Sequence, residues 1–163
     1  MAQLKDTIGY ILKSYPDNLQ SELSNARLTK MVYLSDWKHL LNDGRTITDI
    51  DWYFDNYGPF VRDVEETANQ FPSVFKVSTE TNAYGKRKKV YSLVNERAEF
   101  RLSESERLAV DHIINVTKKL FWDDFIQLVY ATYPVSTSER YTYLDLSRKA
   151  AEYKKLGGGL LLA

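Results

Sequence analysis

The chain has 163 residues, the usual length of one domain, and it carries 22 basic and 22 acidic side chains, so its formal net charge is zero. A neutral chain has no overall field that attracts nucleic acid or a membrane surface. The absence of cysteine excludes disulfide scaffolds, thiol nucleophiles and cysteine-based zinc sites. The N-terminus has no apolar signal-peptide core, and no apolar run has the length of a membrane span. We therefore expect one compact cytoplasmic domain with no role at a membrane.

Two helices are predicted at the start of the chain. Apolar residues recur three to four positions apart from Leu4 to Tyr15, and Pro16-Asp17-Asn18 ends this first helix. Ser24 is a natural N-cap for a second helix that ends at Asn42-Asp43-Gly44. Packing alone explains the apolar stripe of this second helix.

The stretch WYFDNYGPFVRDV, residues 52–64, predicts a strand that turns into a helix. Apolar and polar residues alternate between residues 50 and 56, which is the period of a half-buried strand. Gly58 permits a turn, and Pro59 suits the first position of a helix. We expect that helix over residues 61–70, with Asp63, Glu65 and Glu66 near its positive N-terminal end.

A β-hairpin is predicted next. β-rich runs on either side of residues 82–85, a polar turn that contains glycine, are typical of two antiparallel strands. Together with residues 50–56 they provide a small three-stranded antiparallel sheet. The tip is basic, with the run Lys86-Arg87-Lys88-Lys89. Such a run is ordinarily solvated surface, and a specific contact with phosphate or a protein partner is the alternative.

The last third of the chain is predicted to be helical. Ser103 and Glu106 fit a capping box for a helix that runs to about Lys119, and a further helix spans residues 122–133. A second capping box at residues 136–139 predicts a terminal helix that stops at Gly157. The expected fold is therefore mainly α with a small antiparallel β-sheet, an α+β domain over residues 1–156. Residues 157–163, GGGLLLA, form a flexible apolar tail.

The sequence offers no catalytic constellation. His39 and His112 are interpreted as helix-face residues because neither has the spacing of a metal site. The acidic pairs Glu65-Glu66 and Asp123-Asp124 sit where a helix dipole favours anions, so capping explains them. The glycines at residues 157–159 follow a helix rather than a strand and do not form a phosphate loop. We expect no enzyme activity, no metal and no cofactor.

Three linked motifs carry a resemblance to a known family. The second helix contains Leu28, Lys30, Tyr33 and Asp36 in the pattern Leu-x-Lys-x-x-Tyr-x-x-Asp. A Gly-Arg-x-Ile-Thr turn follows at residues 44–48, and the predicted strand ends in Tyr-Gly-Pro at residues 57–59. In this order the motifs resemble the Panacea domain, the SocA-like antitoxin family, which is also met among phage-associated proteins. The resemblance extends over residues 1 to about 150.

One departure from the family pattern lies near the C-terminus. Many relatives carry a histidine several residues before a Pro-Trp pair, whereas this chain has Tyr133-Pro134 and neither that histidine nor that tryptophan.

The resemblance implies an antitoxin, a non-catalytic domain that neutralises a cognate toxin by direct protein–protein binding. Toxins of such modules include proteins that block translation. Aromatic and arginine side chains dominate protein interfaces. Trp52, Phe54 and Phe60 are interpreted as core residues. We therefore expect the partner to bind other positions of the strand-to-helix corner at residues 52–64 and of the hairpin tip. The candidates are Tyr53, Asp55, Tyr57, Arg62, Tyr84, Arg87 and Lys88.

An alternative is a DNA-binding regulator of winged-helix type, with the helix at residues 61–70 in the major groove and the hairpin as the wing. That helix carries three carboxylates and only one basic residue, Arg62, so its net negative charge would be repelled by DNA phosphates. A weak operator contact of the hairpin within a toxin–antitoxin complex stays open. The apolar tail is predicted either to dock in a groove of this chain or of the toxin, or to serve as a handle for a cytoplasmic protease. A disordered end without a role is the alternative for the tail.

Overall fold

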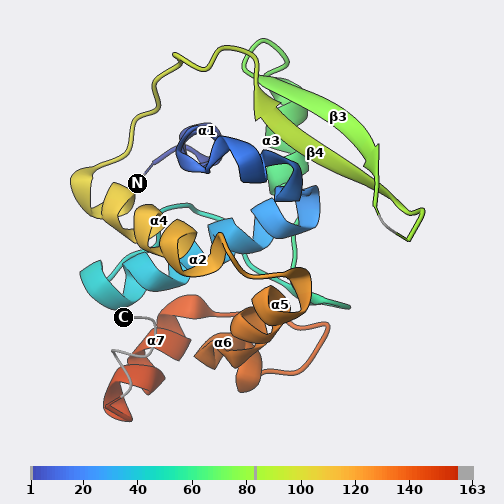
Figure 1. Cartoon of the computed structure of the whole chain (residues 1–163). Coiled ribbons are helices and arrows are strands. Elements are labelled where there is room, and N and C mark those ends of the chain that lie inside the picture. The colour runs from blue at the N-terminus through green and yellow to red at the C-terminus, as the bar shows by residue number, and fades with distance from the viewer. Residues whose placement is uncertain (1, 83, 158–163) are drawn as a thin grey trace.

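The computed structural model describes residues 2–82 and 84–157 (Figure 1). Helices make up most of it, and two short antiparallel ribbons complete it. The helical elements are α1 (Leu4–Ser14), a 3-10 helix (Asp17–Glu22), α2 (Asn25–Asp43), α3 (Asp63–Gln70), α4 (Glu104–Thr117), α5 (Trp122–Ala131), α6 (Tyr133–Ser136) and α7 (Leu146–Lys155). The strands are β1 (Phe54–Asp55), β2 (Gly58–Pro59), β3 (Phe75–Thr81) and β4 (Arg87–Leu93).

Helix α2 forms the centre of the molecule. In Figure 1 α1 lies above α2, and α5, α6 and α7 lie below it. Of its 19 residues 14 are buried, so the helix is enclosed on all sides rather than amphipathic. Enclosure forces polar side chains into the core together with the apolar ones. Four of these carry ionisable groups: Arg27, Lys30, Asp36 and His39.

Three of the predicted helix ends are confirmed: both ends of α2 and the start of α4. The Ser24 side chain accepts a hydrogen bond from the backbone amide of Arg27 at the start of α2, and Gly44 ends the helix in a left-handed conformation, φ +79°. Ser103 and Glu106 form the reciprocal capping box of α4. Local hydrogen-bonding chemistry decides these positions, which is why the sequence predicts them.

The predicted three-stranded sheet is wrong, because the structure has two separate two-stranded sheets. The hairpin pairs Phe75 with Leu93 at one end and Thr81 with Arg87 near its tip. The segment at residues 52–54 does not join it. Its backbone bonds instead to the segment at residues 141–144, with the Leu144 amide donating to the Trp52 carbonyl and the Phe54 amide to the Thr142 carbonyl. A partner about 90 positions away along the chain cannot be read from local alternation.

The strand-to-helix corner also differs from the prediction. The chain doubles back at once, so that β1 and β2 pair as Phe54 with Pro59 and Asp55 with Gly58. Pro59 therefore lies in a strand rather than at the first position of a helix, and α3 starts only at Asp63. A proline is tolerated here because a short edge strand does not need its amide hydrogen. Gly58 has φ +104°, as its predicted turn role requires.

The second predicted capping box, at residues 136–139, is wrong. The Thr137 hydroxyl donates to the Tyr133 carbonyl and so closes the short helix α6. The following residues are drawn into the backbone pairing with residues 52–54, which prevents a helix there. The last helix begins nine residues later than predicted, where Asp145 caps α7 by accepting from the Arg148 amide.

The corner gives a stability prediction with a matched control. Gly58→Val is expected to cost about 1–3 kcal/mol, because a β-branched residue tolerates φ +104° poorly. The strain would come from the backbone, since an added Cβ would meet Tyr130, Lys30 and Val129 only at 3.5–3.8 Å. Tyr57→Ala, at a side chain that is 77% exposed, is expected to change stability by less than about 0.5 kcal/mol. Thermal melts measure the stability of both variants. An equal loss of melting temperature in Gly58→Val and Tyr57→Ala would contradict the assignment of Tyr57 to the surface.

Residues 158–163, the main part of the predicted apolar tail, lie outside the described residues, so docking of the tail and its use by a protease stay predictions. None of the helices in residues 2–82 and 84–157 has both the length and the apolar character to cross a bilayer.

Candidate partner-binding site

Asp36 organises the loop that leads from α2 to the corner. One carboxylate oxygen accepts from the backbone amides of Ile47 and Thr48, each at 2.9 Å. The other accepts from the Thr48 hydroxyl at 2.5 Å and from the Trp52 indole nitrogen at 2.9 Å. A fully buried carboxylate with four donors fixes residues 47, 48 and 52 relative to α2.

Burial sets the charge state of this carboxyl. Removal from water raises the pKa of Asp36 from 3.8 to about 6, and the hydrogen bonds from Thr48, Trp52 and Ile47 oppose that rise. Asp36 is therefore ionised at pH 7, when its two oxygens accept all four hydrogen bonds. The Trp52 ring that it holds packs edge-on against Tyr33, with ring centroids 5.5 Å apart. Tyr33 in turn shares a 2.8 Å hydrogen bond between its hydroxyl and that of Thr132.

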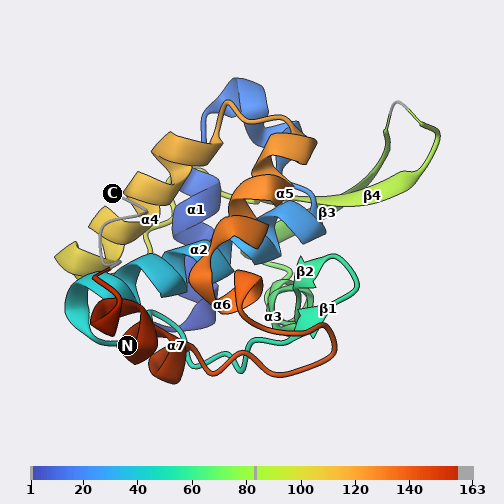
Figure 2. The same ribbon diagram turned by 90° about the horizontal axis from the view of Figure 1, so that it is seen from below.

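A groove lies between α2, the β1–β2 turn and one face of α5. We call it the Lys30 groove. Its volume is about 590 Å³, which is within the range of small-ligand clefts, and apolar and aromatic side chains form most of its wall. In both ribbon views the β1–β2 turn lies close to α5 (Figures 1 and 2). The lining residues are Ala26, Lys30, Asp55, Asn56, Tyr57, Phe60, Lys86, Trp122, Ile126 and Tyr130.

Lys30 is the unusual member of this groove. The residue is only 2% exposed, and its ammonium lies 5.6 Å from the centre of the Phe60 ring. Within residues 2–82 and 84–157 it makes no hydrogen bond and no ion pair. Burial lowers the pKa of Lys30 to about 8, and the charge of Asp55 opposes that shift. At pH 7 the groove therefore contains a positive charge that the described residues leave without a bonded partner.

The other two buried basic groups of α2 are bound by the fold. The Arg27 guanidinium donates to the Thr117 and Leu120 carbonyls at 2.8 and 2.9 Å and stacks 4.4 Å from the centre of the Phe125 ring. The His39 ring contacts the Arg45 carbonyl at 2.6 Å and the Asp43 carboxylate at 3.0 Å. His39 is thus a buried structural residue. No group of three or more metal-binding side chains occurs in the described part of the chain.

The hairpin projects away from the helices, and its tip is the most distant part of it (Figure 2). Asn82 and Gly85 form the turn as predicted, the latter with φ +77°. Two of the four basic side chains at the tip are engaged in the fold: Lys88 donates to the Ser21 carbonyl at 2.9 Å, and Lys89 pairs with Glu65. Both side chains are therefore held against the rest of the fold, and Glu65 offsets the charge of Lys89.

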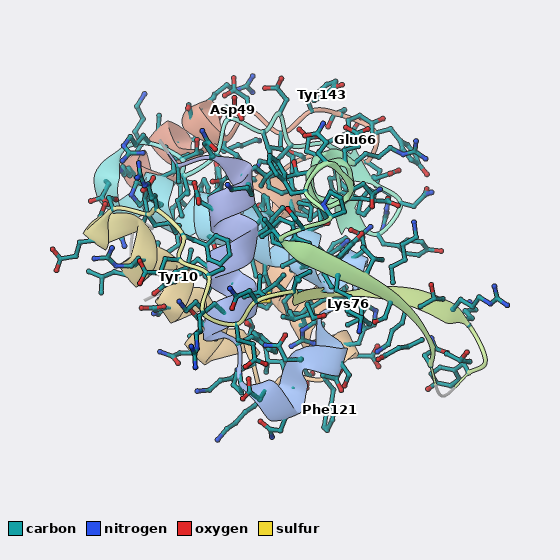
Figure 3. All side chains as sticks on the ribbon, turned by 90° about the horizontal axis from the view of Figure 1, so that it is seen from above. Tyr10, Asp49, Glu66, Lys76, Phe121 and Tyr143 are labelled. Atoms are coloured by element: carbon teal, nitrogen blue, oxygen red, sulfur yellow. The ribbon has the colours of Figure 1, made fainter. Side chains whose placement is uncertain are left out.

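The predicted partner-binding residues are distributed over four places. Asp55 and Tyr57 line the Lys30 groove. Tyr53 lies away from it and packs against Tyr143 with ring centroids 5.1 Å apart, and Arg62 is exposed at the start of α3. Figure 3 shows Tyr143, the partner of Tyr53, at the opposite edge of the molecule from Phe121, the residue that directly precedes α5. The remaining three, Tyr84, Arg87 and Lys88, lie on the hairpin.

Sequence reasoning missed much of the groove. Trp122, Ile126 and Tyr130 recur at four-residue spacing along α5 and so line one face of it, which is a signal that the sequence carries. Lys30 enters the sequence-based prediction only as a residue of the family motif. The signal that marks it is a lysine among apolar neighbours in a helix that is buried all round.

The model of the antitoxin SocA-like Panacea domain matches residues 28–134. The chain belongs to this family. The Panacea match covers less than the expected span of residues 1 to about 150, but it includes most of α2, the Asp36 loop, the corner, the hairpin, α4 and α5. No curated protein and no solved structure matches the chain.

The Panacea signature has a structural explanation at most of its positions. Asp36 holds the loop at residues 47–48, Tyr33 packs on the Trp52 that Asp36 binds, and Gly58 supplies the positive φ of the corner. Leu28 is fully buried in the core. Lys30 is the exception, because its charged end has no bonded partner among the described residues. An antitoxin family implies a protein toxin as partner.

Proposed function

We propose that the chain is the antitoxin of a toxin–antitoxin module and neutralises its cognate toxin by binding it, without catalytic turnover. The observation that carries the proposal is the family match over residues 28–134. The Lys30 groove supports it, because aromatic side chains around a concave, largely apolar site are typical of interface hot spots. The toxin's own chemistry is not specified by the domain.

We further propose that the toxin binds across the mouth of the groove, where Tyr57 is 77% exposed and Trp122 is 43% exposed. Both aromatic rings lose water on contact with a partner, and each is rigid enough to lose little conformational entropy. Tyr57→Ala is therefore a variant in which weaker partner binding and unchanged folding are expected together.

The experiment that tests the proposal is co-purification. A tagged copy of this chain is co-expressed with the product of the neighbouring gene, and the complex is isolated and sized by chromatography with light scattering. A stable complex of fixed stoichiometry is expected. Absence of a complex when both proteins are present and folded would contradict the proposal.

DNA binding is disfavoured by the surface of α3. Its exposed positions carry Asp63 and Glu66 beside Arg62, so the helix would bring net negative charge to phosphate. We therefore expect the isolated chain to bind its own promoter weakly or not at all in a gel-shift assay at physiological salt. Charge reversal at Arg87 is expected to leave the melting temperature unchanged. A tight, sequence-specific shift by the chain alone would favour the winged-helix regulator instead.

A further inference from the structure

Lys30 differs from every other ionisable group buried in α2. Asp36 has four donors, Arg27 has two carbonyl acceptors and His39 has ring contacts on both nitrogens. Lys30 has only the face of Phe60 and the more distant charge of Asp55. A cation that is largely withdrawn from water and has no bonded partner destabilises a fold, so a ligand that brings an acceptor into the groove would be favoured there.

The groove around the ammonium restricts what could compensate it. Phe60, Trp122, Ile126 and Tyr130 give apolar walls, which a strongly hydrated inorganic anion would not favour. Lys86 adds a second positive charge to the lining, and Asp55 adds one negative charge. The balance is positive, so the groove favours an anionic group that is joined to an apolar body.

Lys30 can still provide the charge at neutral pH. Its pKa is lowered by burial to about 8 and stays above 7. The ammonium is therefore protonated in the free protein, and an approaching anion would stabilise that protonated form further.

We propose that Lys30 forms an ion pair with an acidic side chain of the toxin, and that an apolar neighbour of that side chain packs between Phe60, Trp122 and Tyr130. The inference rests on the proposed antitoxin function and adds to it the position and the chemistry of the central contact. A carboxylate suits a single ammonium, and the aromatic walls exclude the water that would otherwise screen the pair. Lys30 thus acts as the charged anchor of the interface and contributes little to the stability of the free fold.

The test is the substitution Lys30→Met, which keeps the length of the side chain and removes the charge. Because the charge has no partner in the free chain, we expect the melting temperature of the variant to stay unchanged or to rise. Its affinity for the toxin is expected to fall about thirtyfold or more, the loss typical of a desolvated interfacial charge pair. Titration calorimetry of purified toxin into each antitoxin variant measures this. The matched control is Lys76→Met at an exposed lysine of β3, which should bind like the wild type.

A second arm tests the chemistry of the site without the toxin. Phenylacetate and its neutral counterpart phenylacetamide are titrated into the protein. Binding of each is followed by NMR through the backbone amide resonances of the groove residues. The wild type is expected to favour the acid, and Lys30→Met is expected to lose that preference.

Four results would overturn the inference. Unchanged toxin affinity of a folded Lys30→Met variant would remove Lys30 from the interface and leave the antitoxin function intact. A marked loss of melting temperature would show that Lys30 is a structural residue. Failure of the wild type itself to bind the toxin would refute the proposed function and this inference together, and equal binding of acid and amide would refute the anion site.

Discussion

Asp36→Ala is expected to lower the melting temperature by about 10 °C or more, or to prevent folding. The substitution removes the acceptor for four hydrogen bonds inside the core. The amides of Ile47 and Thr48 and the indole nitrogen of Trp52 would then be buried donors without an acceptor. Each such group costs about 1–3 kcal/mol, so a total above about 4 kcal/mol is expected. For a chain of this size 1 kcal/mol corresponds to about 2–4 °C.

The control is Asp51→Ala, which removes an exposed carboxylate from the same loop and should change stability by less than about 0.5 kcal/mol. Urea unfolding followed by tryptophan fluorescence measures both variants, since Trp52 reports on the site directly. If Asp36→Ala unfolds at the same urea concentration as the wild type, the carboxylate does not organise this loop.

Arg27→Met is expected to destabilise the chain by about 2–3 kcal/mol. The guanidinium bonds to the carbonyls of Thr117 and Leu120, which join the end of α4 to the start of α5, and it stacks on Phe125. Hydrogen bonds from a charged donor contribute about 1.5–3 kcal/mol each, and the cation–π contact adds to them. The net loss is smaller than the sum because the buried charge disappears too, and because Thr117 keeps a hydrogen bond from the Leu120 amide.

Arg27 and Lys30 form an informative pair because both are buried cations of α2 and lie three residues apart. The same substitution to methionine is expected to destabilise the fold at Arg27 and to leave it unchanged or stabilise it at Lys30. Chemical unfolding of the two variants in the same buffer provides the comparison. Destabilisation of both by the same amount would show that the missing partner of Lys30 has no energetic consequence.

The sequence predicts those features of the fold that local chemistry decides. Ser24, Gly44 and the Ser103 capping box define helix ends within a few residues, and Asn82 with Gly85 defines the hairpin turn. The sheet could not be predicted in this way. Residues 52–54 pair with residues 141–144, and no local pattern records that pairing. The same long-range contact removes the helix that the motif at residues 136–139 suggests.

The site shows the same limit. Tyr57 and Asp55 can be predicted as candidates for partner binding because they lie at a turn, and turns are usually at the surface; both line the groove. The groove itself needs α2 and α5, whose residues Lys30 and Trp122 are 92 positions apart in the chain and meet only in the fold. A lysine in an apolar helix is visible in the sequence, but its lack of a partner is a property of the packed structure alone.

The central proposal, that this chain neutralises a toxin by binding it, is tested most directly by growth of cells that express the neighbouring gene under one promoter and this chain under another. The neighbour alone is expected to arrest growth, and growth should return when the wild-type chain is co-expressed at comparable levels. Restoration by Lys76→Met but not by Lys30→Met would agree with the proposed anchor as well. A neighbour that is harmless alone, or one that stays toxic beside abundant folded wild-type chain, would contradict the antitoxin function.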